Sequence, residues 1–188
     1  MNGCLVIISG PSAVGKTSVA TEILKRHANL FERVITCTTR APRGTEKHGV
    51  DYIFMSEQEF LEKKSNNEFL EDSRVYSNYY GVLKKTVDDI ILKNKDALLV
   101  MNWEGYLKIK NKINQKVVGI FLLPPSIKTL EERIRNRGDD SEDEIQKRLK
   151  MNEEDMIYAS YFDYQIVNHQ INDTVNQILQ LVDNIKEK

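Results

Sequence analysis

The chain has no excess of either charge, only two cysteines and no long apolar run. It contains 27 Lys and Arg residues and 28 Asp and Glu residues, and this balance gives no general attraction to nucleic acid or to an anionic membrane. Cys4 and Cys37 lie in separate apolar segments without metal-ligand spacing, which favours buried reduced thiols over a disulfide. The first apolar run breaks at Ser9, short of a signal-peptide core, and no later segment approaches a membrane span. We therefore expect a cytoplasmic protein without nucleic-acid or membrane partners.

The apolar segments that are present predict a parallel sheet. A chain of 188 residues that is 40% hydrophobic is long enough for one well-packed core and too short for two large domains. Continuous rather than alternating hydrophobicity indicates strands covered on both faces, and right-handed crossovers then give a doubly wound α/β core. The expected strands are Leu5 to Ser9, Ala97 to Met101, Val117 to Leu123 and Tyr164 to Val167.

Two polar intervals interrupt this pattern. The first, 34–85, carries several tyrosines and a helix start at Ser56, and it predicts an insertion with a binding face. The second, 126–158, is densely charged and helical, with a helix end at Arg137 and Gly138 and a fresh capping box at Ser141; it predicts a lid. The expected single domain, 1–188, thus consists of a core (1–33, 86–125 and 159–188), the insertion 34–85 and the lid 126–158.

The segment after the first strand fits the phosphate-binding pattern G-x-x-x-x-G-K-[ST]. Its glycines let successive N–H groups turn toward phosphate oxygens at the positive end of the following helix. Lys16 adds a mobile charge for the β and γ phosphates, and Thr17 offers a hydroxyl to Mg²⁺. The predicted ATP-binding loop is Gly10, Pro11, Ser12, Ala13, Val14, Gly15, Lys16 and Thr17.

Several further segments occur together with this loop. They are Thr38 to Arg43, Gly49 to Tyr52, Glu68 to Glu71, Asn78 to Gly81 and Arg133 to Arg148. In this order the chain closely resembles the guanylate kinase family over almost its whole length. The resemblance implies a P-loop kinase fold and the reaction ATP + GMP ⇌ ADP + GDP with Mg²⁺, in purine nucleotide metabolism, by a monomer or homodimer.

The resemblance also assigns a GMP site. It implies that Arg40, Arg43, Tyr52 and Tyr80 hold the GMP phosphate, and guanidinium forks with phenol donors suit a dianionic phosphate. Glu71 corresponds to the guanine reader, since a carboxylate accepts from both donors on the edge of guanine. Thr36 and Asn102 fall at further positions of that site.

On the ATP side, the resemblance implies that Arg137 and Arg148 close on the transferred phosphate as catalytic residues together with Lys16. Arg133, one helical turn before Arg137, is a weaker candidate because these helices are rich in ion pairs. Asn168 matches the loop on the adenine side.

Four residues depart from the family pattern, and the mildest change is Ser77, which replaces the glycine before Asn78. Ala13 replaces a loop glycine, which is tolerable only if the residue keeps a negative φ. Val82 replaces a Ser or Thr whose hydroxyl contacts the base, which predicts weaker GMP binding. Asn102 replaces an aspartate, so the site carries less negative charge for Mg²⁺.

These departures leave two alternatives to an active guanylate kinase. One is a related phosphotransferase with a non-guanine acceptor such as a ribose bisphosphate, which Val82 and Asn102 favour and Glu71 opposes. The other is a non-catalytic binding module with the same fold, which the intact loop from Gly10 to Thr17 opposes.

Overall fold

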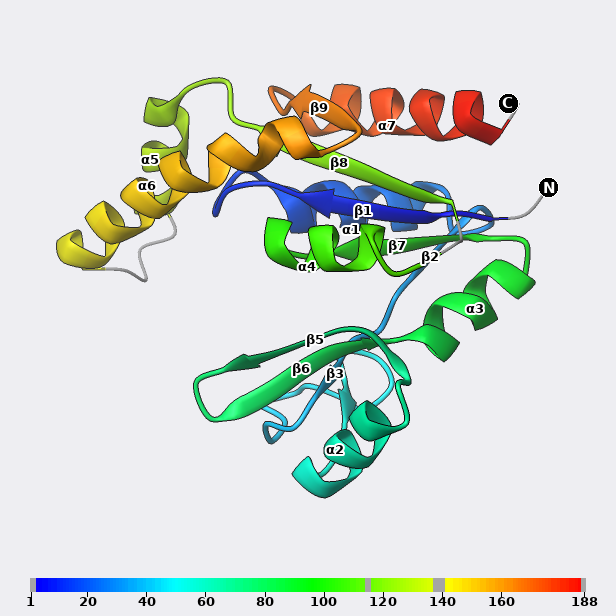
Figure 1. Cartoon of the computed structure of the whole chain (residues 1–188). Helices are drawn as coiled ribbons and strands as arrows, with labels where there is room; N and C mark the ends of the chain where they lie inside the picture. The colour runs from blue at the N-terminus through cyan, green and yellow to red at the C-terminus, as the bar shows by residue number, and fades with distance from the viewer. Residues whose placement is uncertain (1–2, 114–115, 137–140, 187–188) are drawn as a thin grey trace.

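The computed structural model describes residues 3–113, 116–136 and 141–186 of the chain. Its centre is a five-stranded parallel sheet in the order β2-β7-β1-β8-β9 (Figure 1). The strands are β1 (Leu5–Ser9), β2 (Phe31–Arg33), β7 (Asp96–Val100), β8 (Val117–Leu123) and β9 (Tyr164–Val167). The doubly wound core is therefore confirmed, with one strand, β2, that the sequence did not predict.

Helices cover both faces of this sheet because alternate residues of each strand point to opposite sides. Val6 and Ile8 of β1 pack in a cluster with residues of α1 (Lys16–Arg26) and α7 (Ile171–Lys186). Leu5 and Ile7 pack in a second cluster with residues of α3 (Lys84–Leu92) and α4 (Trp103–Lys110). Burial on both faces explains why the central strands are apolar throughout.

The interval 34–85 forms a smaller body below the core (Figure 1). Its four-stranded sheet has the order β4-β3-β6-β5, and Phe60 of the covering helix stacks on Phe69 at 4.4 Å between ring centroids. The elements are β3 (Cys37–Thr38), β4 (Ile53–Phe54), α2 (Glu57–Ser65), β5 (Phe69–Val75) and β6 (Asn78–Leu83). Leu70 and Val82 from its hairpin join the core cluster beneath β1, so the smaller body is packed onto the sheet.

The charged interval forms two helices, α5 (Ile127–Arg135) and α6 (Glu142–Met156), followed by the short 3-10 helix η1 (Ile157–Tyr161). The predicted capping box at Ser141 is present, because Ser141 and Glu144 exchange side-chain and backbone hydrogen bonds. The predicted helix end at Arg137 and Gly138 lies outside the described residues.

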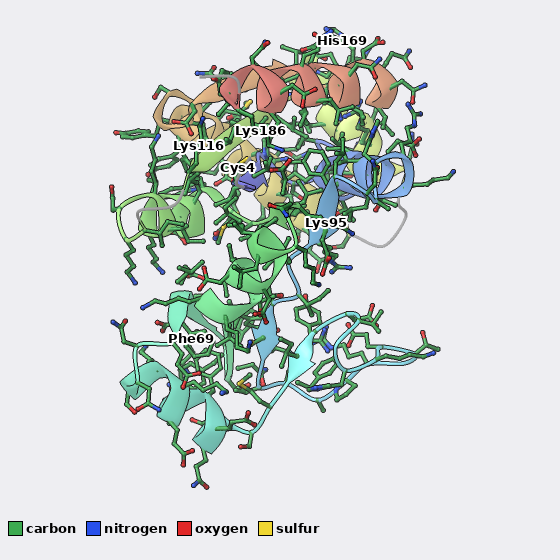
Figure 2. The ribbon with its side chains drawn as sticks, turned by 90° about the vertical axis from the view of Figure 1, so that its right-hand side faces the viewer. Cys4, Phe69, Lys95, Lys116, His169 and Lys186 are labelled. Atoms are coloured by element: carbon green, nitrogen blue, oxygen red, sulfur yellow. The ribbon has the colours of Figure 1, made fainter. Side chains whose placement is uncertain are left out.

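An ion pair between the buried Asp96 and the partly exposed Lys186 joins the last helix to the sheet. Asp96 accepts from the Cys4 N–H at 3.0 Å and from Lys186 Nζ at 2.5 Å. Figure 2 shows Lys116 and Lys186 near the buried Cys4. Burial, with Asp96 adjacent, raises the pKa of Cys4 to about 12, and burial raises that of Cys37 equally. Both thiols are free, as predicted.

In the described part of the chain, no helix is both long enough and apolar enough to cross a membrane.

Candidate active site

The loop after β1 has a backbone shaped for phosphate. Gly10 has φ 139° and lies so close to Leu122 that an added Cβ would come within 2.5 Å of its carbonyl oxygen. Gly15 has φ 105° and forms the N-cap of α1, where an added Cβ would lie 2.6 Å from Asn168 Nδ2. The loop thus leads from the carboxyl end of β1 to the N-terminus of α1, where unpaired N–H groups and the helix dipole favour an anion.

Ala13 corrects the expectation of a negative φ. Its φ is 63°, in the left-handed region, which costs a non-glycine residue roughly 1–2 kcal/mol. Its side chain is buried against Ile134 of α5 and Ile145 of α6. Packing against the helical hairpin therefore offsets the strain, an effect that the local sequence does not show.

Lys16 lies folded over the loop. Its Nζ donates to the carbonyl oxygens of Gly10 at 2.7 Å and Pro11 at 2.9 Å. Those are weak partners for an ammonium group compared with phosphate oxygens, so the side chain is placed to exchange them when an anion enters. Thr17 follows on the exposed first turn of α1.

A cavity of about 340 Å³ lies between the loop and the helical hairpin. It is lined by Ala13, Gly15, Ser18, Arg133, Asn136, Asn168, His169 and Ile171. Arg133 donates to the carbonyl oxygens of Val14 at 3.0 Å and Asn168 at 3.4 Å, so its guanidinium holds the loop. Asn168 is buried, donates to Val14 O at 2.8 Å and accepts from Thr174 at 2.8 Å, which shapes the floor of the cavity.

Of the two arginines that the sequence predicts to be catalytic, the structure describes one. Arg148 is exposed on α6, one turn before Asn152. Arg137 lies outside the described residues.

A second cavity, of about 250 Å³, lies between the hairpin β5–β6 and the ends of β7 and α4. Its lining includes the predicted GMP residues Thr36, Tyr52, Glu71, Tyr80 and Asn102, together with Val82. Residues predicted from distant segments therefore meet at one place. Asn102 also caps α4, because its Oδ1 accepts from Gly105 N–H at 3.1 Å.

Glu71 is the acidic group of this cavity. The residue is 6% exposed, and Lys108 Nζ from α4 donates to its Oε1 at 3.2 Å. Burial raises the pKa of Glu71 above its ordinary value, and the adjacent Lys108 opposes that shift. The structure thus holds a desolvated carboxylate that is hydrogen-bonded to the cation of Lys108.

The predicted phosphate ligands Arg40 and Arg43 do not line this cavity. Arg40 pairs in bidentate fashion with Glu46, at 2.6 and 2.7 Å, and lies 5.0 Å over the Tyr52 ring. The side chain of Arg43 is exposed, while its N–H donates to Glu46 at 2.8 Å. Glu46, whose pKa the Arg40 hydrogen bonds lower to about 2, thus organises the arginine loop beside Tyr52.

Sequence reasoning missed Glu46, Lys108 and Asn152. Asn152 of α6 is 1% exposed and hydrogen-bonds the backbone of Ser12. A buried asparagine in an otherwise charged helix is the only local signal for it. No local sequence pattern indicates the contact of Lys108, because its partner Glu71 lies 37 residues away in the chain.

The glycine-rich loop at the end of β1, the cavity that it lines, the second cavity under the hairpin β5–β6 and the parallel sheet together define the fold of a P-loop kinase. Comparison with known proteins specifies the family, because a family model for guanylate kinase matches residues 2–185. The chain belongs to the guanylate kinase family.

Individual relatives agree with that assignment. Guanylate kinase from Carboxydothermus hydrogenoformans is 42% identical over 94% of this chain and 85% of its own length. That from Rickettsia bellii is 39% identical over 96% of this chain and 93% of its own. The crystal structure of guanylate kinase from Anaplasma phagocytophilum superposes with a TM-score of 0.74 at 33% identity, covering 100% of this chain and 88% of that one.

Proposed function

We propose that this chain transfers the γ-phosphoryl group of ATP to GMP, giving ADP and GDP. The observation that carries this proposal is the second cavity, in which Glu71, Tyr52, Tyr80 and Thr36 meet, in a chain whose phosphate loop, Gly10 to Thr17, is intact. Family membership supports the same reaction.

In the acceptor site, Glu71 accepts from the two donors on the edge of guanine, which adenine lacks. Tyr52 and Tyr80 donate to the GMP phosphate, and Arg40 and Arg43 reach it from the loop that Glu46 organises. The interval 34–85 thus acts as the GMP-binding insertion.

In the donor site, the N–H groups at the start of α1 and Lys16 bind the β and γ phosphates, while the adenine lies in the cavity beside Asn168. The interval 126–158 acts as the lid and brings Arg148 and Arg137 to the transferred group.

The residues present fit a Mg²⁺ ion held mostly by nucleotide and water. Thr17 presents an exposed hydroxyl next to Lys16, and Mg²⁺ in kinases takes few protein ligands besides phosphate oxygens. No cluster of three His, Cys, Asp or Glu side chains suited to a metal occurs in residues 3–113, 116–136 and 141–186. When bound, the ion would neutralise charge on the β and γ phosphates.

The chemistry needs no covalent intermediate and no strong general base, since the GMP phosphate is already a nucleophile at neutral pH. The protein must align it with the γ phosphate, screen charge and exclude water. We place this reaction in the cytoplasm, which the two reduced thiols support.

The test is the initial rate with Mg-ATP and each of GMP, deoxy-GMP, AMP, UMP and a ribose bisphosphate. We expect turnover that is selective for guanine nucleotides. Absence of turnover with millimolar GMP, or equal turnover with AMP, would overturn the proposal.

Two variants measure the departures from the family pattern. Val82→Thr keeps the shape of the buried side chain and supplies a hydroxyl in the cavity, so the KM for GMP should fall about two- to tenfold. Asn102→Asp keeps the helix cap and adds a carboxylate, so kcat/KM should rise. Unchanged constants in both variants would show that these positions do not limit the enzyme.

A further inference from the structure

The phosphate loop is paired with a side chain from the lid. Ser12 N–H donates to Asn152 Oδ1 at 2.7 Å, and Asn152 Nδ2 donates back to Ser12 O at 3.2 Å. The amide thus satisfies both backbone groups of one loop residue, across 140 positions of sequence. Since Asn152 is 1% exposed, water does not compete for these bonds.

The pairing adjoins the strained residue of the loop. Ala13 follows Ser12 directly and holds φ 63°, and its side chain is buried against Ile134 and Ile145. Val14 comes next, and its carbonyl oxygen accepts from Asn168 and Arg133. Residues 12, 13 and 14 are therefore each fixed by a side chain from outside the loop.

The same pairing fixes the lid helix. Arg148 lies four residues before Asn152 on α6, hence one turn away on the same face. An amide locked to Ser12 therefore sets where the turn that carries Arg148 stands relative to the phosphate loop.

We infer that Asn152 is a positioning residue that keeps the phosphate loop in its nucleotide-binding shape and fixes the base of the lid on it. Asn152 acts through Ser12 and Ala13 and does not touch the nucleotide. The role rests on the proposed function in one respect, that the loop binds the phosphates of ATP.

The test compares Asn152→Ala with Glu153→Ala, which truncates an exposed neighbour on the same helix. Without the two hydrogen bonds, Ala13 is free to relax toward negative φ and the loop loses its shape. We expect the KM for ATP to rise about tenfold in Asn152→Ala, the KM for GMP to stay within about twofold, and kcat to fall. Glu153→Ala should match the parent.

A double-mutant cycle separates positioning from general destabilisation. Glycine at position 13 adopts positive φ without strain, so adding Ala13→Gly to Asn152→Ala should lower the KM for ATP about threefold. Ala13→Gly in the parent should not produce the same improvement. An unchanged KM for ATP in Asn152→Ala, or an equal effect of Ala13→Gly in both backgrounds, would overturn the inference.

Equilibrium binding of a fluorescent ADP analogue keeps this result distinct from the proposed function, because it needs no turnover. A parent that binds ADP but does not phosphorylate GMP would sink the proposed function, while the affinities still decide the role of Asn152. If Asn152→Ala does not fold, Asn152→Ser, which leaves a polar site open to water, is measured with the same expectation.

Discussion

At the scale of single residues, the proposed function of Glu71 and its burial favour opposite protonation states. Guanine recognition needs a carboxylate, while burial favours the protonated acid and raises the pKa. We therefore expect the KM for GMP to rise on acidification, beginning above the ordinary range of glutamate at about 4.3. Lys108→Met removes the opposing cation and should move this rise to higher pH, whereas Lys108→Arg should not. A pH profile of the KM for GMP checks both variants.

The raised pKa of Glu71 also makes the stability of the fold depend on pH. An acid with a raised folded-state pKa binds more protons folded than unfolded between its two pKa values. Stability is therefore lost as pH rises through that window, and it stays lost at neutral pH. Glu71→Gln should raise the melting temperature at pH 7.5 and less so at pH 4, while raising the KM for GMP about 5- to 100-fold.

The control for this prediction is Glu57→Gln, at an exposed position of α2. It should change neither quantity. A Glu71→Gln variant that melts lower than the parent at pH 7.5 would contradict the pH argument.

The acceptor-site residues could be predicted because the family motifs carry them. Thr36, Tyr52, Glu71, Tyr80 and Asn102 indeed line one cavity, while their roles stay predictions. The negative φ expected for Ala13 was wrong because the side chains that hold it come from the lid. The hydrogen bonds between Asn152 and the distant backbone of Ser12 could not be predicted, because one polar side chain produces no periodic pattern in the sequence.

At the scale of elements, α7 packs on the sheet through its apolar face and also through an ion pair with the buried Asp96. Asp96 is 1% exposed at the start of β7, and Lys186 in the last turn of α7 donates to it. Lys186→Met removes the cation and leaves a buried carboxylate that accepts from the Cys4 N–H and thiol, which should cost about 3 kcal/mol of unfolding free energy. Urea unfolding measures this loss.

The double variant Asp96→Asn with Lys186→Met is the control for the charge. It keeps an acceptor for the Cys4 N–H and removes the unpaired carboxylate, so it should recover most of the loss. Equal destabilisation of the single and double variants would assign the effect to packing of the lysine stem.

The bounds of a strand could be predicted from the sequence where the strand is buried along its whole length. The structure matches the predicted strands at Leu5–Ser9, Val117–Leu123 and Tyr164–Val167, and β7 begins one residue earlier than predicted. It adds β2, a three-residue edge strand that includes Glu32 and Arg33, which has no apolar run to detect. Short edge strands form by pairing with a neighbour, here β7, and not from their own composition.

At the scale of the whole molecule, the insertion 34–85 and the central sheet share one core cluster. Leu70 and Val82 of the insertion pack in the same cluster as Leu5, Ile7 and Leu99 of the central sheet. The insertion also has a small cluster of its own around Cys37, Phe60 and Phe69, but opening it away from the sheet would expose the shared cluster to water. The insertion and the sheet should therefore unfold together.

Calorimetry checks this coupling. We expect one transition with equal calorimetric and van't Hoff enthalpies, and GMP at about 100 times its Kd should add about 2.7 kcal/mol to the stability of the whole chain. Leu70→Ala opens the shared cluster and should broaden or split the transition, whereas Leu61→Ala, at 43% exposure on α2, should not. Two transitions in the parent, only one of them shifted by GMP, would mean that the insertion holds GMP as an independent unit, and closure over ATP would then have to come from the ligands alone.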